Sequence, residues 1–264
     1  MDLGIRGKTA VVCAASKGLG RGCAEALAEA GVKLALNARS AGPLEETAKA
    51  IRDRYGVEAV AVPGDITDAG AQAELLAAAR DLAGGEVDIL VNNAGGPPPG
   101  LWSDWSEEDW LKALKANMLT PIALTKAVLP GMMEKGWGRV VNITSTSVKA
   151  PIPILGLSNG ARAGLTGFAA TVARQVAGKG VTINNLLPGT HDTDRIQAID
   201  TATAERMGKS LEAVRADRAA AIPAGRYGTV EEFGKACAFL CSVHAGFIVG
   251  QNLLLDGGAV NATI

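Results

Sequence analysis

Apolar residues in this chain occur in short runs that alternate with segments where they recur every three or four positions. The short runs predict buried strands, and the longer period predicts amphipathic helices. Strands are predicted at residues 9–13, 33–37, 57–62, 87–92, 139–143, 181–187 and 250–256. Helices are predicted at residues 20–30, 45–55, 69–83, 106–135 (in two pieces), 162–178 and 230–240.

Strands with near-continuous apolar sequence, alternating with helices, predict a parallel sheet that is covered on both faces. Right-handed crossovers make such a sheet doubly wound. We therefore expect an α/β fold of Rossmann type with seven parallel strands, formed by residues 1–264 as a single domain. Residues 190–228 are polar, rich in alanine and charged, and we interpret them as a mobile helical insertion beside the substrate.

Charge and composition exclude several classes of partner. The net charge is −1, from 26 basic and 27 acidic residues that are well mixed, which argues against nucleic acid and against an anionic membrane surface. No apolar run reaches the roughly 18 residues of a membrane span. The first eight residues lack the apolar core of a signal peptide, and the four cysteines include no C-x-x-C pair. We expect a cytoplasmic protein without a metal site.

A glycine-rich turn follows the first predicted strand, where residues 13–20 run Cys-Ala-Ala-Ser-Lys-Gly-Leu-Gly. Gly18 and Gly20 would let the backbone approach a pyrophosphate at the N-terminus of the next helix. An ordinary tight turn is the alternative, but the position between a strand and a helix favours a dinucleotide site. In such sheets ligands bind beyond the carboxyl ends of the strands, so the loops after residues 13, 37, 62, 92, 145 and 187 should meet in one crevice.

The second predicted strand is followed by Arg39, where a NAD site places an acidic residue for the ribose 2′-hydroxyl. Lys17 and Arg39 offer two cations to a 2′-phosphate, and the planar fork of arginine suits phosphate. The alternative is that both are solvated surface charges. Because no acid competes for this position, the sequence predicts NADP as the cofactor.

These motifs resemble the short-chain dehydrogenase/reductase family, in particular its β-ketoacyl-acyl-carrier-protein reductase-like group, over nearly the whole chain. The resemblance rests on the turn, on Asn92-Asn93-Ala94-Gly95, on Pro188-Gly189 with Thr193, and on the closing Gly250-Gln251 and Asp256-Gly257-Gly258. It implies a carbonyl/alcohol oxidoreductase that forms a homotetramer. The apolar stripe of the helix predicted at residues 162–178 and the apolar residues 252–255 support that assembly, because such surfaces would be a liability if exposed. Together with the turn, the resemblance assigns these cofactor residues: Ala14, Ser16, Lys17, Gly18, Leu19, Gly20, Asn37, Arg39, Ser40, Asp65, Ile66, Asn92, Asn93, Ala94, Gly95, Arg162, Pro188, Gly189 and Thr193.

The same resemblance implies that Ser145 holds the substrate carbonyl and that Asn117 positions a relay water. A tyrosine acid and a lysine should follow, but their positions hold Ser158 and Arg162. A serine hydroxyl is a far weaker acid than a phenol, whose pKa is about 10. Arginine stays charged, so Arg162 can bond the ribose and stabilise an anion but cannot pass on a proton.

Three groups could replace the missing acid: His191 in the loop after Pro188-Gly189, Lys149, and Ser158 as a relay from water. His191 is the best candidate because histidine titrates near neutral pH, although a structural or solvent-exposed role is an equal alternative. The two tyrosines, Tyr55 and Tyr227, lie on segments that we do not expect at the nicotinamide.

The substrate side of the predicted crevice is apolar. Leu101, Trp102 and Trp105 follow a proline-rich break, and residues 152–155 precede Ser158. These side chains could form the wall of a hydrophobic pocket, whereas for Trp110 packing under the next helix is the better alternative. The sequence predicts an NADP(H)-dependent oxidoreductase for an apolar or acyl substrate, with an atypical proton donor. The alternative is an NADP(H)-binding protein that has lost its chemistry.

Overall fold

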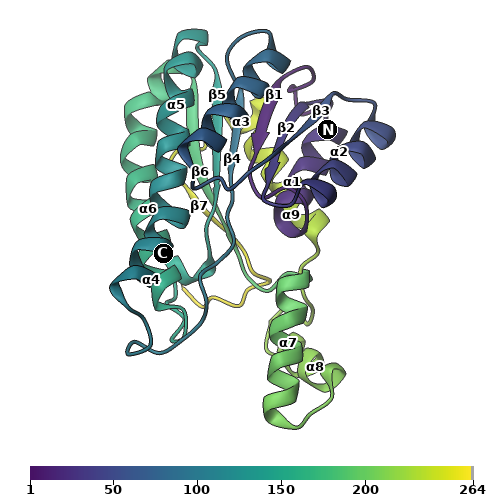
Figure 1. Ribbon diagram of the computed structural model, residues 1–264, viewed down its shortest axis with the longest axis vertical. Coiled ribbons are helices and arrows are strands. Elements are labelled where there is room, and N and C mark those ends of the chain that lie inside the picture. The colour runs from purple at the N-terminus through teal and green to yellow at the C-terminus, as the bar shows by residue number, and fades with distance from the viewer. Residues whose placement is uncertain (263–264) are drawn as a thin grey trace.

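A computed structural model describes residues 1–262 of the chain. The described residues form a seven-stranded, all-parallel sheet in the order β3-β2-β1-β4-β5-β6-β7 (Figure 1). The strands are β1 Thr9–Val12, β2 Lys33–Ala38, β3 Ala59–Pro63, β4 Ile89–Asn92, β5 Gly138–Ile143, β6 Val181–Pro188 and β7 Asn252–Leu255. The predicted single-domain, doubly wound α/β fold is thereby confirmed.

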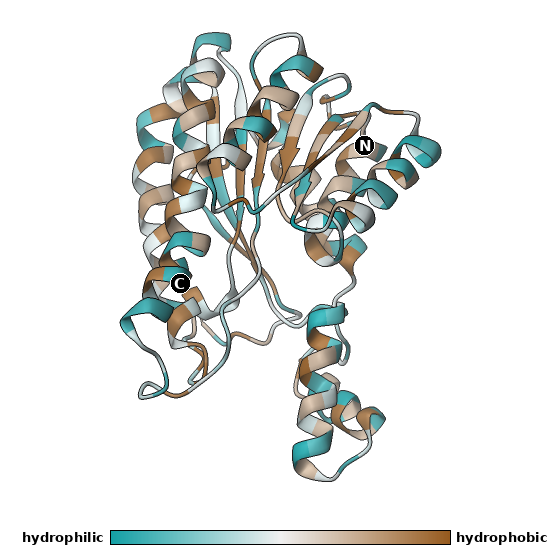
Figure 2. Cartoon of the chain, viewed as in Figure 1, coloured by the Kyte–Doolittle hydropathy of each residue, from teal (hydrophilic) through white to brown (hydrophobic). Residues whose placement is uncertain are grey.

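Helices cover both faces of the sheet. The α-helices are α1 Gly18–Glu29, α2 Ala41–Tyr55, α3 Ala69–Ala83, α4 Glu107–Leu114, α5 Thr120–Lys135, α6 Gly156–Val176, α7 Asp194–Met207, α8 Leu211–Ala220 and α9 Val230–Leu240. Helices α1, α2 and α9 share one core with Val12 of β1, and α3, α5 and α6 share the other with Val11. Neighbouring residues of a strand face opposite layers, so nearly every strand position is apolar. Figure 2 shows these brown strands at the centre of the molecule.

The strand order reverses between β1 and β4. The first half of the chain builds outward from β1 to β3, and the second half returns to the other side of β1 and builds outward to β7. The loops that leave β1 and β4 therefore turn in opposite directions and leave a crevice at the carboxyl end of the sheet. Ligands of open α/β sheets bind at this switch point.

A row of buried asparagines fixes the register of four strands. The side-chain amide of Asn92 donates to Asn142 at 2.8 Å, that of Asn142 to Asn185 at 2.9 Å, and that of Asn185 to Asn252 at 2.8 Å. These residues are direct neighbours across β4, β5, β6 and β7. A buried amide is costly unless it is hydrogen-bonded, so sliding one strand would leave two amides without partners.

Helices α7 and α8 project from the carboxyl end of the sheet as a separate arm (Figure 1). The fully buried Asp200 of α7 joins them, because its carboxylate lies 2.8 Å from Arg218 of α8 and accepts a 2.9 Å hydrogen bond from the hydroxyl of Tyr227. Residues 190–228 thus include two helices, α7 and α8. None of the helices in residues 1–262 is long and apolar enough to cross a membrane.

The helix predicted at residues 162–178 begins earlier, at Gly156. Its apolar stripe includes Leu165, Ala169 and Ala173, and all three are buried. Ala169 and Ala173 pack in the core that α6 shares with the sheet. The stripe is therefore explained by folding of the single chain, and it gives no support to the predicted oligomer.

The asparagine row should contribute measurably to stability. Replacing Asn142 by leucine leaves the side-chain oxygen of Asn185 without a donor. It also removes the side-chain oxygen that accepts the shortest hydrogen bond of the Asn92 amide. Unsatisfied buried groups of this kind cost about 1–3 kcal/mol each, so we expect a loss of about 2–4 kcal/mol in the free energy of unfolding. Urea denaturation measures it. The control is Asn252→Ala at the less buried end of the row, which should cost clearly less; equal losses would contradict the register argument.

Candidate active site

The turn between β1 and α1 has the backbone of an anion site. Ala14 and Gly18 have φ angles of 50° and 55°, a region that favours glycine, and Gly20 has no room for a Cβ because the Ala14 carbonyl oxygen lies against it. Lys17 is the N-cap of α1, and among the described residues no side chain caps the helix there. The first N–H groups of α1 are therefore free to bind a phosphate group.

Three loops meet around this turn. A Cβ built on Gly20 would lie 2.8 Å from the side-chain nitrogen of Asn93, which follows β4. A Cβ on Gly18 would lie 3.7 Å from a methyl carbon of Thr193, which follows β6 and caps α7. Asn93 and Thr193, predicted from sequence as cofactor residues, are thus brought to the glycine-rich turn. Ala94, Gly95, Pro188 and Gly189 lie on the same two loops and are at least partly accessible.

The predicted 2′-phosphate site lies at the start of α2. Arg39 and Ser40 are exposed, and among the described residues Ser40 makes no side-chain cap and the first turn of α2 holds no acid. Asp65 is close enough to Arg39 for the guanidinium to lower its pKa further, after the main effect of two hydrogen bonds from Thr67. The ammonium of Lys17 lies 3.5 Å from Asp194 of α7, and both side chains are exposed.

The side chains of several other predicted cofactor residues make contacts inside the protein. The buried Asn37 amide donates to the carbonyls of Val62 and Gly64, and Asn92 belongs to the asparagine row. Ile66 is buried in the core beside α3. Leu19 is partly buried against the other core. These residues shape the crevice through packing and through their backbone, and the side chains of Asn37, Asn92 and Ile66 are not accessible to a ligand.

Ser158 and Arg162 form a buried pair on the first turns of α6, with 6% and 7% of their surface exposed. Nε of Arg162 donates to the Ser158 hydroxyl at 3.1 Å, and Nη1 donates to the carbonyl of Ile143, the last residue of β5, at 2.8 Å. Burial, together with the nearby positive charge of Arg195, lowers the pKa of Arg162 to about 10. The guanidinium is thus charged at neutral pH. It is bonded to the backbone of Ile143, which precedes Ser145 by two residues in the sequence.

Ser145 continues from β5 with extended backbone and caps a short 3-10 turn, accepting a hydrogen bond from the Ser147 N–H at 3.1 Å. Asn117 lies in a π-helical turn, Lys115–Leu119, between α4 and α5. Its side-chain oxygen, Oδ1, is buried without a hydrogen-bond partner among residues 1–262. Single π-helical turns occur often at functional sites. The next residue, Met118, packs on α6 at Gly164, so the turn of Asn117 lies beside the helix of Ser158.

His191 is not placed to donate a proton. Its ring is 4% exposed, packs edge-on against Phe233 at a centroid distance of 5.2 Å, and lies against Gly228. Nδ1 is 3.3 Å from the Gly189 carbonyl, and burial lowers the pKa of the imidazole. The side chain packs on the core of α1 and α9, and these contacts favour the structural alternative for His191 over the role of proton donor.

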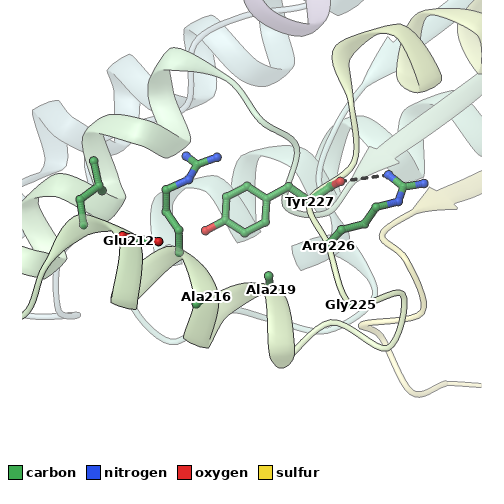
Figure 3. A pocket seen from close by; sticks show the side chains of 8 residues that line it. Glu212, Ala216, Ala219, Gly225, Arg226 and Tyr227 are labelled. Atoms are coloured by element: carbon green, nitrogen blue, oxygen red, sulfur yellow. Dashed lines mark hydrogen bonds between the residues drawn. The ribbon is translucent and has the colours of Figure 1, made fainter.

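The two tyrosines are also unsuited. The Tyr227 hydroxyl donates to Asp200 in the arm, and burial followed by that hydrogen bond raises its pKa to about 12. Tyr227 lines a hollow on the arm with Glu212, Ala216 and Ala219 of α8 (Figure 3). Burial also raises the pKa of Tyr55, which ends α2. Of the three groups that could replace the acid, Ser158 is the one next to a buried cation.

The apolar residues of the substrate side divide into two groups. Trp105 and Trp110 contact each other edge-on at 6.3 Å and lie against Gly156 and Gly160 of α6, so the packing alternative for Trp110 is the better one. Trp102 is 88% exposed, and Leu101 and Ile154 are also exposed. These three are available to an apolar substrate chain.

One charged residue of the crevice was missed by the sequence analysis. Arg195, in the first turn of α7, reaches back so that its guanidinium lies against Gly96 and donates to the Pro97 carbonyl at 3.5 Å. A Cβ on Gly96 would collide with this guanidinium. The sequence contained an indication of this residue, because a cation in the first turn of a helix is unfavourable for the helix dipole and is therefore unusual there.

Comparison with known proteins agrees with this geometry. A family model described as Enoyl-(Acyl carrier protein) reductase matches residues 13–260. A 3-oxoacyl-[acyl-carrier-protein] reductase from Vibrio cholerae is 37% identical over 258 residues, which cover 97% of this chain and 98% of that protein.

Two solved structures share the fold. L-sorbose reductase from Gluconobacter frateurii, complexed with NADPH and L-sorbose, has a TM-score of 0.94 and 27% identity, covering 99% of this chain and 100% of that one. A 3-oxoacyl (acyl-carrier-protein) reductase from Agrobacterium tumefaciens C58 with NADP bound has a TM-score of 0.87 and 31% identity, covering 97% and 96%. The chain belongs to the short-chain dehydrogenase/reductase family.

Proposed function

We propose that this protein is an NADP(H)-dependent oxidoreductase that interconverts a carbonyl and an alcohol on an apolar or acyl substrate, with an atypical proton donor. The observation that carries the proposal is the buried Ser158–Arg162 pair, which is bonded to Ile143 at the end of β5, two residues before Ser145 in the sequence. The relatives support it, because they are named as reductases and two of the solved structures hold NADPH or NADP.

The residues around the glycine-rich turn fit a dinucleotide. The uncapped start of α1 would take the diphosphate, and the uncapped start of α2 with Arg39 and Ser40 would take the 2′-phosphate. Thr193 stands over the turn, and the free donors of Arg162 would reach the nicotinamide ribose. When bound, the cofactor supplies or accepts a hydride.

The site can stabilise negative charge on the substrate oxygen. The Ser158 hydroxyl accepts from Arg162, so its own hydrogen is free to be donated to a carbonyl oxygen held by Ser145. The buried guanidinium behind it stabilises charge that develops on that oxygen, and a preorganised cation in a buried site is effective at this. The proton then comes from water through Ser158, with Asn117 as the residue that orients the water.

The second candidate is an NADP(H)-binding protein without catalytic activity, and the absence of an acidic side chain at Ser158 favours it. The two candidates are separated by measuring NADPH binding, through the fluorescence of the cofactor, beside NADPH oxidation with a panel of aldehydes and ketones. Binding together with turnover supports the oxidoreductase. Tight binding without turnover of any carbonyl compound supports the alternative.

Replacing Arg39 by aspartate should change the cofactor preference. The exposed guanidinium is the cation at the start of α2, and charged hydrogen bonds of this kind contribute about 1.5–3 kcal/mol. We expect the dissociation constant of NADPH to rise about 10- to 100-fold, while that of NADH changes little. Arg54→Asp, at the far end of α2, is the matched control and should affect neither. Equal binding of both cofactors before and after R39D would contradict the assignment.

Restoring the usual acid should increase turnover of neutral ketones. The double variant Ser158→Tyr with Arg162→Lys supplies a phenol and an ammonium that can lower its pKa, and a placed general acid contributes about 10²- to 10⁴-fold. We expect kcat to rise in that range with simple apolar ketones, measured by NADPH oxidation. The single variant Arg162→Ala should weaken NADPH binding, because it removes the ribose donors, and should also lower kcat, because it removes the buried charge behind Ser158. If the unaltered protein already reduces such ketones rapidly, another group supplies the proton.

We expect the protein to be a homotetramer in solution. Strand β7 forms the edge of the sheet, and near it the chain exposes Leu253, Val243 and the whole side chain of Phe247. Apolar side chains gathered in this way are typical of a covered surface. Light scattering at micromolar concentration should give four times the mass of the chain, and a clean monomer mass would rule the assembly out.

A further inference from the structure

Two arginines converge on the crevice without an acid to balance them. Arg162 reaches the end of β5, and Arg195 lies over Gly96, four residues beyond the end of the neighbouring strand β4. Among residues 1–262, neither guanidinium has a carboxylate within 4.0 Å; the acid next to Arg195, Asp194, faces Lys17 instead. Burial lowers the pKa of Arg195 as well as that of Arg162, and the two charges repel each other.

A buried cation without a partner is costly, and Arg162 is such a cation, whereas Arg195 is an exposed residue whose guanidinium is only partly desolvated. Three of the five N–H groups of Arg162 remain after its bonds to Ser158 and to the Ile143 carbonyl. Arg195 makes one long hydrogen bond, to the Pro97 carbonyl at 3.5 Å. The three N–H groups of Arg162 would be shared between the nicotinamide ribose and a second ligand, Arg195 keeps further donors, and the planar fork of arginine matches a carboxylate.

We propose that Arg162 and Arg195 bind the carboxylate of a 2-oxo acid whose carbonyl oxygen is held by Ser145 and Ser158. This inference rests on the proposed function, because it names the substrate class of that site. The Ser158 hydroxyl lies 3.1 Å from the Arg162 guanidinium, so the carbonyl and the carboxylate must be adjacent in the substrate. The exposed Leu101, Trp102 and Ile154 would contact an apolar chain on the other side of the carbonyl.

The reaction is balanced without a further reagent. A hydride from NADPH adds to the carbonyl carbon, and the carbonyl π bond breaks toward oxygen. That oxygen takes a proton from water, which gives a 2-hydroxy acid and NADP⁺. The two cations offset the negative charge that would otherwise accumulate as an alkoxide forms beside a carboxylate.

Binding to the oxidised complex tests the site without turnover. The full-length protein is saturated with NADP⁺ and titrated by calorimetry with 2-oxooctanoate and with methyl 2-oxooctanoate, which differ in the charge of one group. We expect the acid to bind at least about 30-fold more tightly than the ester, the lower range for a buried charge pair. Equal affinities, or no binding of the acid at millimolar concentration, would overturn the proposal.

Variants on α7 show whether Arg195 binds the substrate carboxylate or the cofactor diphosphate. Arg195→Gln should remove the preference for the acid and leave the affinities for the ester and for NADP⁺ unchanged, whereas Arg195→Lys should keep part of the preference. Arg206→Gln is the matched control, because Arg206 is an exposed arginine in the last turn of the same helix. If Arg195→Gln weakens NADP⁺ instead of the acid, the guanidinium serves the cofactor diphosphate and the proposal is wrong.

The proposed oxidoreductase activity is tested by a separate measurement of turnover. NADPH oxidation with 2-oxooctanoate, compared with the ester, gives kcat/KM values that should differ in the same direction as the affinities. An acid that binds through Arg195 but is not reduced would contradict the oxidoreductase and still support the carboxylate site. Reduction of neutral ketones with no preference for the acid would support the oxidoreductase and overturn the carboxylate site.

Discussion

The register of the strands at the carboxyl edge of the sheet is the constraint on which the crevice depends. Asn92, Asn142, Asn185 and Asn252 are bonded in sequence across β4 to β7, and each strand end is thereby fixed relative to the next. The loops that carry Asn93, Ser145 and Thr193 begin within a few residues of this row. A shift of one residue in any strand would reverse its side chains and displace its loop.

At the end of β5 the protein has a buried cation, Arg162, beside Ser158, which stands in place of the family's acidic tyrosine. Arg162 is bonded to the end of β5 and to Ser158, so its position is determined by the sheet and by the first turns of α6. A guanidinium would not donate its proton in the proposed reaction, but its charge would stabilise negative charge that develops on the substrate. Arg195 adds a second charge from α7, and Gly96 is the residue that makes room for it.

The arm of α7 and α8 carries two of the residues that face the crevice. Its two helices are held together by Asp200, Arg218 and Tyr227, and these contacts lie within the arm rather than against the sheet. Arg195 and Thr193 stand at the base of the arm, next to Gly96 and Gly18. A displacement of the arm would therefore move Arg195 and Thr193 together.

The sequence alone determined the fold, because the apolar periodicity of a parallel sheet and the glycine-rich turn are local properties of the chain. It also located Ser158 and Arg162, since their spacing from Ser145 matches the family pattern while their residue types depart from it. It could not show that His191 packs on Phe233, because a loop histidine has the same sequence signal whether its ring is buried or exposed. Nor could it pair Arg162 with Arg195: they lie on different helices, and only the folding of α7 toward Gly96 brings the two charges to one crevice.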